Sequence, residues 1–214
     1  MIPIQYALRR RMMMAVGGGA PISELPLGAL INVGTDGGAG TPNYEIADKD
    51  NLVSGGVVLV RKEIYSNSVF GSNALYSNST LDNLINTTIY SLMPQKLRDK
   101  MMDVTFYLSG SGDITRKMFA LSYTMVQASS SGEGKRLQLY TNNTLRIKKL
   151  NGSAAGWWLC SQYSDQVVWY VYSEGSTNGY YIWSSLGVVP AFVIPSKTSY
   201  NATPNTDGSY NLIL

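Results

Sequence analysis

The side chains that most enzymes use for catalysis are scarce in this sequence. It contains no histidine, which removes the usual general base and the commonest metal ligand. The single cysteine, Cys160, has no histidine to activate it and is expected to pack as a small apolar side chain. The 14 acidic residues show no spacing that singles out an acid and base pair. We therefore predict a protein that is not an enzyme and uses no cofactor or metal. A glycan-active enzyme, with carboxylates brought together from distant segments, is the catalytic alternative.

Two short segments invite comparison with ligand-binding loops. Residues 134–135 are Gly-Lys, as in a phosphate-binding loop, but Ser129 stands where that loop needs glycine and Arg136 where it needs serine or threonine. Residues 48–51, Asp-Lys-Asp-Asn, lack the glycine and glutamate spacing of a calcium loop. We interpret the second segment as a hairpin turn.

Aromatic side chains are the feature that favours ligand binding. Residues 157–183 contain all four tryptophans and five tyrosines, interleaved with Ser, Asn, Gln and Gly. Large rigid aromatics beside small polar side chains are typical of binding surfaces. The predicted contact residues are Tyr163, Tyr172, Asn178, Tyr180, Tyr181 and Trp183. Trp157, Trp158, Trp169 and Pro190 are predicted to be structural. A core with its outward faces is the alternative interpretation of the tyrosines.

Strands are expected to position these residues. The 21 glycines and 15 tyrosines favour strands and turns over long helices, which predicts an α+β, mostly β class. The strands expected in the last third of the chain are 156–159, 167–172, 180–183 and 188–194, with turns at 173–176 and at Asn178-Gly179.

One or two helices are expected at about residues 79–103. Ser79 and Asp82 fit a capping box, and Leu81, Leu84, Ile85 and Ile89 fall on one helical face. Pro94 suits the first turn of a short second helix.

The chain is expected to form one domain with an extension at each end. Residues 1–24 are predicted to be an N-terminal assembly arm, basic at Arg9, Arg10 and Arg11, with no periodic apolar face. The compact domain is expected over residues 25–195, and residues 196–214 as a surface tail. The net charge of +3 comes partly from the arm, so we expect no nucleic-acid partner. No apolar run is long enough to cross a bilayer, so we expect no membrane insertion.

Several strings within residues 25–195 carry a family resemblance. They are Leu84-Ile85-Asn86 with Ile89-Tyr90, Trp157-Trp158-Leu159-Cys160-Ser161, and Gly187-Val188-Val189-Pro190-Ala191-Phe192-Val193. Their order resembles the uncharacterised lectin-like domains of Firmicutes, their phages and gut metagenomes. The resemblance implies a C-type-lectin-like fold with short antiparallel strands. Cys160 and Val189 replace two arginines of that pattern, which implies an apolar contact in place of a polar one. The calcium-dependent sugar motifs Glu-Pro-Asn and Trp-Asn-Asp are absent, so the resemblance implies a shape rather than a sugar ligand.

The first twelve residues, Met1 to Met12, resemble the leaders of small phage virion proteins. That resemblance implies a virion protein made in the bacterial cytoplasm, held in a homo-oligomeric assembly through its arm on other virion proteins. The domain would then be displayed for binding to a host surface glycan or protein. A capsid or tail decoration protein that binds only other virion proteins is the alternative, and the sequence does not choose between the two.

Overall fold

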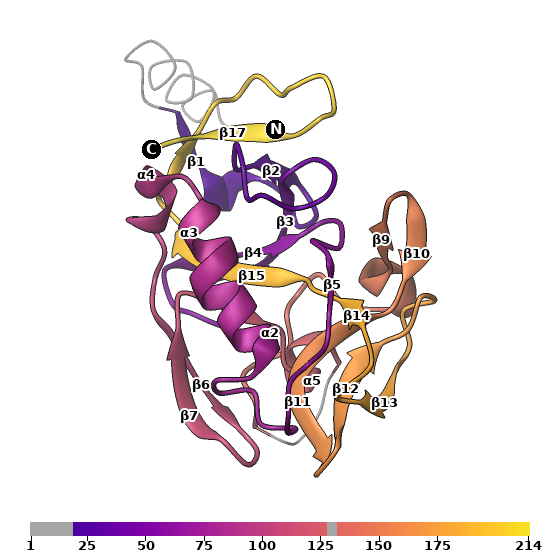
Figure 1. Cartoon of the computed structure of the whole chain (residues 1–214). Coiled ribbons are helices and arrows are strands. Elements are labelled where there is room, and N and C mark those ends of the chain that lie inside the picture. The colour runs from indigo at the N-terminus through magenta and orange to yellow at the C-terminus, as the bar shows by residue number, and fades with distance from the viewer. Residues whose placement is uncertain (1–18, 128–131) are drawn as a thin grey trace.

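The structure, a computed structural model, describes residues 19–127 and 132–214 (Figure 1). It is mostly β with few helices, which confirms the predicted α+β, mostly β class. The predicted arm residues Arg9, Arg10 and Arg11 lie outside the described residues.

An eight-stranded sheet forms the larger part of the described fold. Across this sheet the strands run β1 (Ala20–Pro21), β16 (Ser199–Tyr200), β17 (Tyr210–Ile213), β2 (Leu30–Asn32), β3 (Asn43–Lys49), β4 (Gly56–Arg61), β15 (Pro190–Pro195) and β8 (Met118–Ala120). Neighbouring strands are antiparallel except β17 and β2. All six residues of β4 are buried, because its Val-Val-Leu-Val run is covered on both faces. This strand and β15 therefore form the centre of the core.

A continuous 13-residue helix covers one face of that centre (Figure 1). It comprises α2 (Thr80–Asn83), the π-helical η2 (Leu84–Ile89) and α3 (Tyr90–Leu92). Half of the predicted capping box is present, since Ser79 Oγ accepts a hydrogen bond from Asp82 N at 3.0 Å, whereas the Asp82 carboxylate accepts from Asn78 N instead of Ser79 N. Of the predicted stripe, Leu81, Ile85 and Ile89 are buried, and Leu84 is half-buried against the same core. The second helix, α4 (Gln95–Arg98), follows Pro94 but ends earlier than Asp103.

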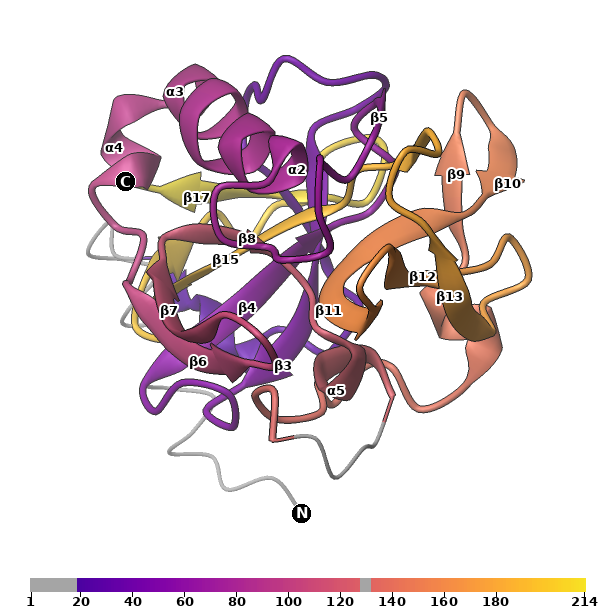
Figure 2. The same cartoon turned by 60° about the horizontal axis from the view of Figure 1, so that its bottom comes forward.

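A five-stranded sheet lies beside the first (Figure 2). Its order is β13 (Thr177–Tyr181), β12 (Val167–Val171), β11 (Trp157–Ser164), β14 (Leu186–Gly187) and β5 (Asn67–Ser68). The remaining strands form two hairpins, β6 (Val104–Leu108) with β7 (Gly112–Arg116) and β9 (Lys148–Leu150) with β10 (Ser153–Ala155). Three short helices complete the described fold: η1 (Ile22–Glu24), α5 (Tyr123–Val126) and η3 (Asn143–Arg146).

Both predicted domain boundaries are wrong. Residues 196–214 are not a surface tail, because β16 and β17 pair within the eight-stranded sheet. At the other end, β1 pairs with β16 and Ile22 is fully buried, so the domain begins before residue 25. Both segments are too short and polar to show a strand period, and their pairing partners are distant in the sequence.

The predicted turn at Asn178-Gly179 is also wrong. These residues lie within β13, where Asn178 pairs with Tyr170 and Gly179 with Trp169. The turn between β12 and β13 is the predicted one at residues 173–176, where Gly175 has φ +86° and donates to the Tyr172 carbonyl. Gly179 therefore forms no turn; the absence of a side chain there makes room for the ring of Tyr163.

Candidate functional site

The aromatic residues of the last third gather on and around β12 and β13. We call Tyr123, Tyr163, Trp169, Tyr180, Tyr181 and Trp183 the aromatic surface. Strand β13 is the edge strand of its sheet, so no further strand of that sheet pairs with its outer side. Residues that face each other across an antiparallel pair share one side of the sheet, which sorts the aromatic rings into groups.

The first group is a stack of three rings built on Trp169. The rings of Trp169 and Tyr123 are stacked, with centroids 4.0 Å apart and planes at 20°. Tyr163 meets the same indole edge-on, with ring centroids 4.8 Å apart. A Cβ added at Gly179 would lie 2.9 Å from Cγ of Tyr163, so the glycine provides the space in which this tyrosine lies. The tyrosine is 53% exposed, and the stack therefore presents rings to solvent.

The second group is the pair formed by Tyr181 and Trp183. Their rings are stacked at 4.7 Å with an interplanar angle of 12°. Tyr181 is 52% exposed and Trp183 is 58% exposed. Two parallel rings with this much free area form a flat apolar platform with polar tips, which is suited to ligand contact.

The third group continues from Tyr180 into the core. Tyr180 is exposed, and its ring lies 5.2 Å from that of the buried Tyr170. Burial raises the pKa of Tyr170 above its ordinary value, and its hydrogen bond with the half-buried Tyr172 adds to the shift. The phenol therefore stays neutral and anchors the exposed ring to the sheet. Exposed Asn178 uses its side-chain oxygen to accept a hydrogen bond from Gly179 N at 2.8 Å.

Of the residues predicted to be structural, some are buried in the core and one is half-buried at the surface. Trp157 and Trp158 are fully buried, and their indole N–H groups donate to the Arg146 carbonyl at 3.0 Å and the Ser68 carbonyl at 2.8 Å. Pro190 is buried in β15. Trp169, expected in the core with them, is only half-buried and belongs to the aromatic surface, because its position in the alternation of β12 faces outward. Tyr123 was not predicted to take part, since it comes from α5, far from the other rings in sequence.

Two buried ion pairs connect strands β4 and β3 of the eight-stranded sheet to segments outside it. Arg61 Nε donates to Asp36 at 2.6 Å, and Lys148 Nζ donates to Glu45 at 2.5 Å. Burial alone would raise the pKa of Glu45, but the charges of Lys148 and Lys62 hold it below its ordinary value. These carboxylates are held by cations in the interior, which suits a structural role.

Cys160 and Val189, for which the resemblance implied an apolar contact, are both apolar and buried. Cys160 is 1% exposed, and so is Val189. Burial raises the pKa of the Cys160 thiol well above its ordinary value, and the charge of Glu133 adds to the shift. The thiol is therefore neutral.

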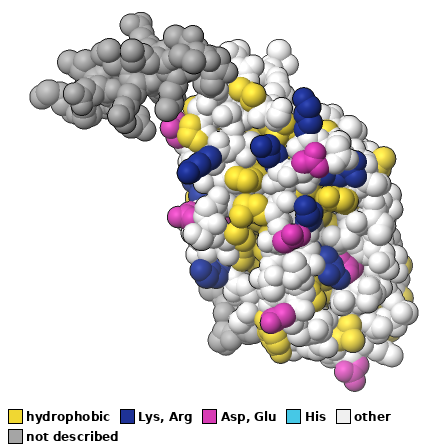
Figure 3. Space-filling view, turned by 90° about the vertical axis from the view of Figure 1, so that its left-hand side faces the viewer, with side chains coloured by type: hydrophobic (Ala, Val, Ile, Leu, Met, Phe, Trp, Pro, Cys, Tyr) yellow, Lys and Arg dark blue, Asp and Glu magenta, His cyan; other side chains and the backbone are white. Residues whose placement is uncertain are grey.

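The rest of the described residues add no metal-ligand cluster. In residues 19–127 and 132–214, no three Cys, Asp or Glu side chains come together in a way that could hold a metal ion. No helix in the same residues is both long and apolar enough to cross a bilayer. The face that carries α4 and the β6–β7 hairpin mixes cationic and acidic side chains with hydrophobic ones (Figure 3).

The fold and the aromatic surface together define a mostly β, α+β domain with an exposed aromatic edge. Residues 55–196 match the family described as "Domain of unknown function (DUF6273)". The chain belongs to that family. Neither the curated proteins nor the solved structures contain a significant match.

Proposed function

We propose that this chain is a non-enzymatic binding protein that uses its aromatic surface to attach to a glycan on a cell surface. The observation that carries the proposal is the stacked pair Tyr181 and Trp183, both more than half exposed. Sugar rings have apolar C–H faces that pack on flat aromatic rings, while their hydroxyl groups bond to nearby polar groups. Tyr180, whose ring centroid lies 6.4 Å from that of Tyr181, supplies one such group, and the hydroxyl of Tyr181 and the indole N–H of Trp183 supply others.

The rigidity of the aromatic surface supports the same proposal. Tyr163, Trp169, Tyr180 and Tyr181 come from paired strands, and Trp169, Tyr170 and Gly179 position the rings of Tyr123, Tyr180 and Tyr163. Trp183 lies in the turn after β13 and is held by stacking on Tyr181. Rigid aromatic side chains lose little conformational entropy on binding, which favours affinity. A flexible loop bearing the same residues would bind more weakly.

The setting of the proposal comes from the two resemblances. A C-type-lectin-like domain in a phage virion protein would display this surface toward the host, with the arginines of the predicted N-terminal arm, Arg9, Arg10 and Arg11, joining it to other virion proteins. In that setting the protein is found in the virion after synthesis in the bacterial cytoplasm. A decoration protein bound only by virion proteins is the competing function, and the experiment below separates the two.

The test is binding of purified full-length protein to an array of bacterial surface oligosaccharides and to whole bacterial cells. We expect Tyr181→Ala and Trp183→Ala to weaken binding at least about tenfold, which is roughly 1.4 kcal/mol each. The matched control is Tyr107→Ala, because Tyr107 is 46% exposed but lies on the separate β6–β7 hairpin. Equal binding by all three variants, or no binding by the unaltered protein, would overturn the proposal and favour the decoration function.

A further inference from the structure

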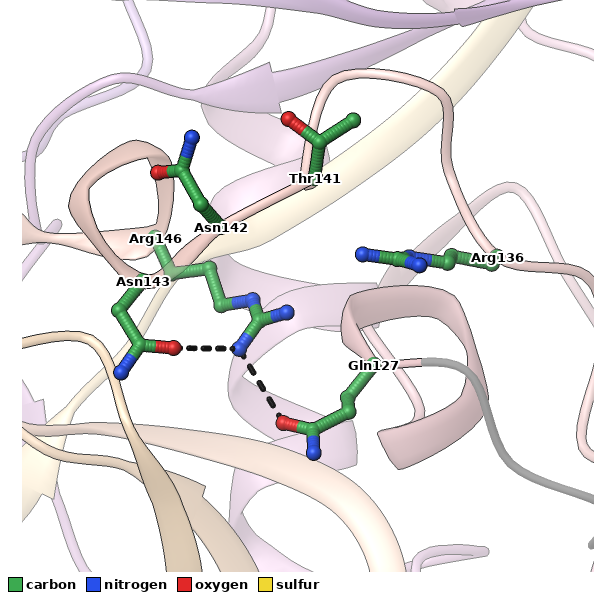
Figure 4. Close-up of a pocket in the computed structure, with 6 residues that line it drawn as sticks. All are labelled: Gln127, Arg136, Thr141, Asn142, Asn143 and Arg146. Carbon is green, nitrogen blue, oxygen red and sulfur yellow. Dashed lines mark hydrogen bonds between the residues drawn. The ribbon is translucent and has the colours of Figure 1, made fainter.

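A pocket lined by polar and cationic side chains lies next to the aromatic surface. It has a volume of about 490 Å³ and is lined by Gln127, Arg136, Thr141, Asn142, Asn143 and Arg146. The two guanidinium groups extend toward each other across it, and no acidic side chain is among the described residues that line it (Figure 4). The pocket therefore offers two cations and several amide or hydroxyl groups without a counter-charge.

Arg146 is the more unusual of the two cations because it is buried. It is 4% exposed, and its Nη1 donates to Gln127 Oε1 at 3.1 Å and to Asn143 Oδ1 at 3.0 Å. Its Nε is buried and has no hydrogen-bond partner among the described residues. A buried donor without a partner is costly, so it points to a group that is bound from outside the chain.

The electrostatics of the pocket favour an anion. Neither Arg136 nor Arg146 forms an ion pair within the described residues. Burial lowers the pKa of Arg146, and the neighbouring charge of Arg136 lowers it further. A bound anion would relieve both effects, and paired guanidinium groups match the two oxygens of a carboxylate.

Gln127 joins the pocket to the aromatic surface. Its Oε1 also accepts a hydrogen bond from Thr177 Oγ1 of β13 at 3.1 Å. Its backbone N donates to the carbonyl of Tyr123, whose ring stacks on Trp169. A ligand that spans the two features would contact the rings with its sugar faces and the arginines with its charged group.

We propose that the Arg136 and Arg146 pocket binds the carboxylate of an acidic sugar, so that the ligand of the aromatic surface is an acidic glycan. This inference rests on the proposed function and names the class of glycan. The amide and hydroxyl groups of Asn142, Asn143 and Thr141 suit the hydroxyl groups of the same sugar.

The pocket is tested first with free glucuronate as the probe. Titration with glucuronate should raise the melting temperature of the full-length protein, whereas glucose at the same concentration and ionic strength should not. Arg136→Gln should abolish the shift, and Arg136→Lys should keep part of it. Lys96→Gln is the control, because it removes one exposed positive charge from α4. No shift with glucuronate, or the same shift in Arg136→Gln, would overturn the acidic-sugar inference.

A second measurement separates this inference from the proposed function. An oligosaccharide ending in glucuronic acid is compared with the same oligosaccharide after its carboxyl group has been reduced to an alcohol. We expect the acidic form to bind at least about tenfold more tightly, and Arg136→Gln to remove that preference. Trp183→Ala should weaken both forms equally. If both forms bind the unaltered protein equally, the pocket inference fails and the aromatic surface stands. If neither form binds, the pocket inference fails. If the unaltered protein also binds neither the oligosaccharide array nor whole bacterial cells, the proposed function fails as well.

Discussion

The ring of Tyr163 lies over Gly179, where a side chain at position 179 would bring its Cβ within 2.9 Å of Cγ of the tyrosine. The absence of a side chain there lets the ring reach Trp169 and complete the three-ring stack. One glycine in an edge strand therefore determines how an exposed aromatic residue is placed on the candidate site.

Gly179→Ala should displace Tyr163 from Trp169. The added Cβ would also lie 2.6 Å from Val167 Cγ1, so both side chains must shift, and we expect a loss of about 1 to 3 kcal/mol in stability. The near-ultraviolet circular dichroism of the tryptophans should change and glycan binding should weaken. In the Tyr163→Ala background the same substitution should have little further effect on either signal. An equal spectral change in both backgrounds would contradict this explanation of the glycine.

The aromatic segment should separate into residues that hold the fold and residues that bind. Trp158→Ala should cost about 3 to 5 kcal/mol of the ~5 to 15 available to a domain, because the indole is fully buried and packs edge-on against Phe70 at 5.8 Å. Tyr180→Ala and Tyr181→Ala should cost under about 1 kcal/mol in stability. Urea unfolding followed by fluorescence measures both.

Trp158→Phe is the matched variant for that prediction. It keeps an aromatic ring but leaves the Ser68 carbonyl without the indole donor, so an intermediate loss of about 1 to 3 kcal/mol is expected. Equal melting temperatures for Trp158→Ala and Tyr181→Ala would contradict the division between core and surface.

Features set by neighbouring residues could be predicted from the sequence. The Ser79 cap and the buried stripe of Leu81, Ile85 and Ile89 depend only on spacing along one helix, and both are present. The apolar run of β4 likewise indicates a central strand whatever its partners are.

Features set by distant residues could not be predicted in the same way. The dipeptide Asn178-Gly179 is typical of a turn, and only the position of Tyr163 shows why a strand contains it. Trp169 was expected in the core because tryptophans are commonly buried, but its outward position and its partner Tyr123 follow from the packing of α5 on β12. Arg136 and Arg146 have no local motif between them, so their shared pocket appears only in three dimensions.

The segment predicted as a surface tail should prove necessary for stability. A chain ending at residue 196 would lose β16 and β17, including the buried Tyr200, and would uncover the fully buried Ile22. Loss of a buried aromatic residue typically costs about 3 to 5 kcal/mol, so the melting temperature should fall sharply. Removal of Leu214 alone, beyond the end of β17, is the control and should change little. A truncated chain that melts like the full-length protein would show that the last strands contribute nothing to the core.

Asp207 should make the attachment of this C-terminal segment sensitive to acid. Hydrogen bonds from the Ser209 side chain, the Asn43 side chain and the Ser209 backbone lower the pKa of Asp207 from 3.8 to about 2. A carboxylate whose pKa is lower in the folded state stabilises the fold above pH 3.8, and that contribution is lost as the pH falls toward 2. Asp207→Asn should therefore be less stable than the unaltered protein at pH 5, with the difference disappearing near pH 2. Asn43→Ala removes one donor and should reproduce part of the effect, and urea unfolding at several pH values measures it. A difference that stays constant from pH 5 to pH 2 would mean that the side-chain shape, and not the charge, matters at this position.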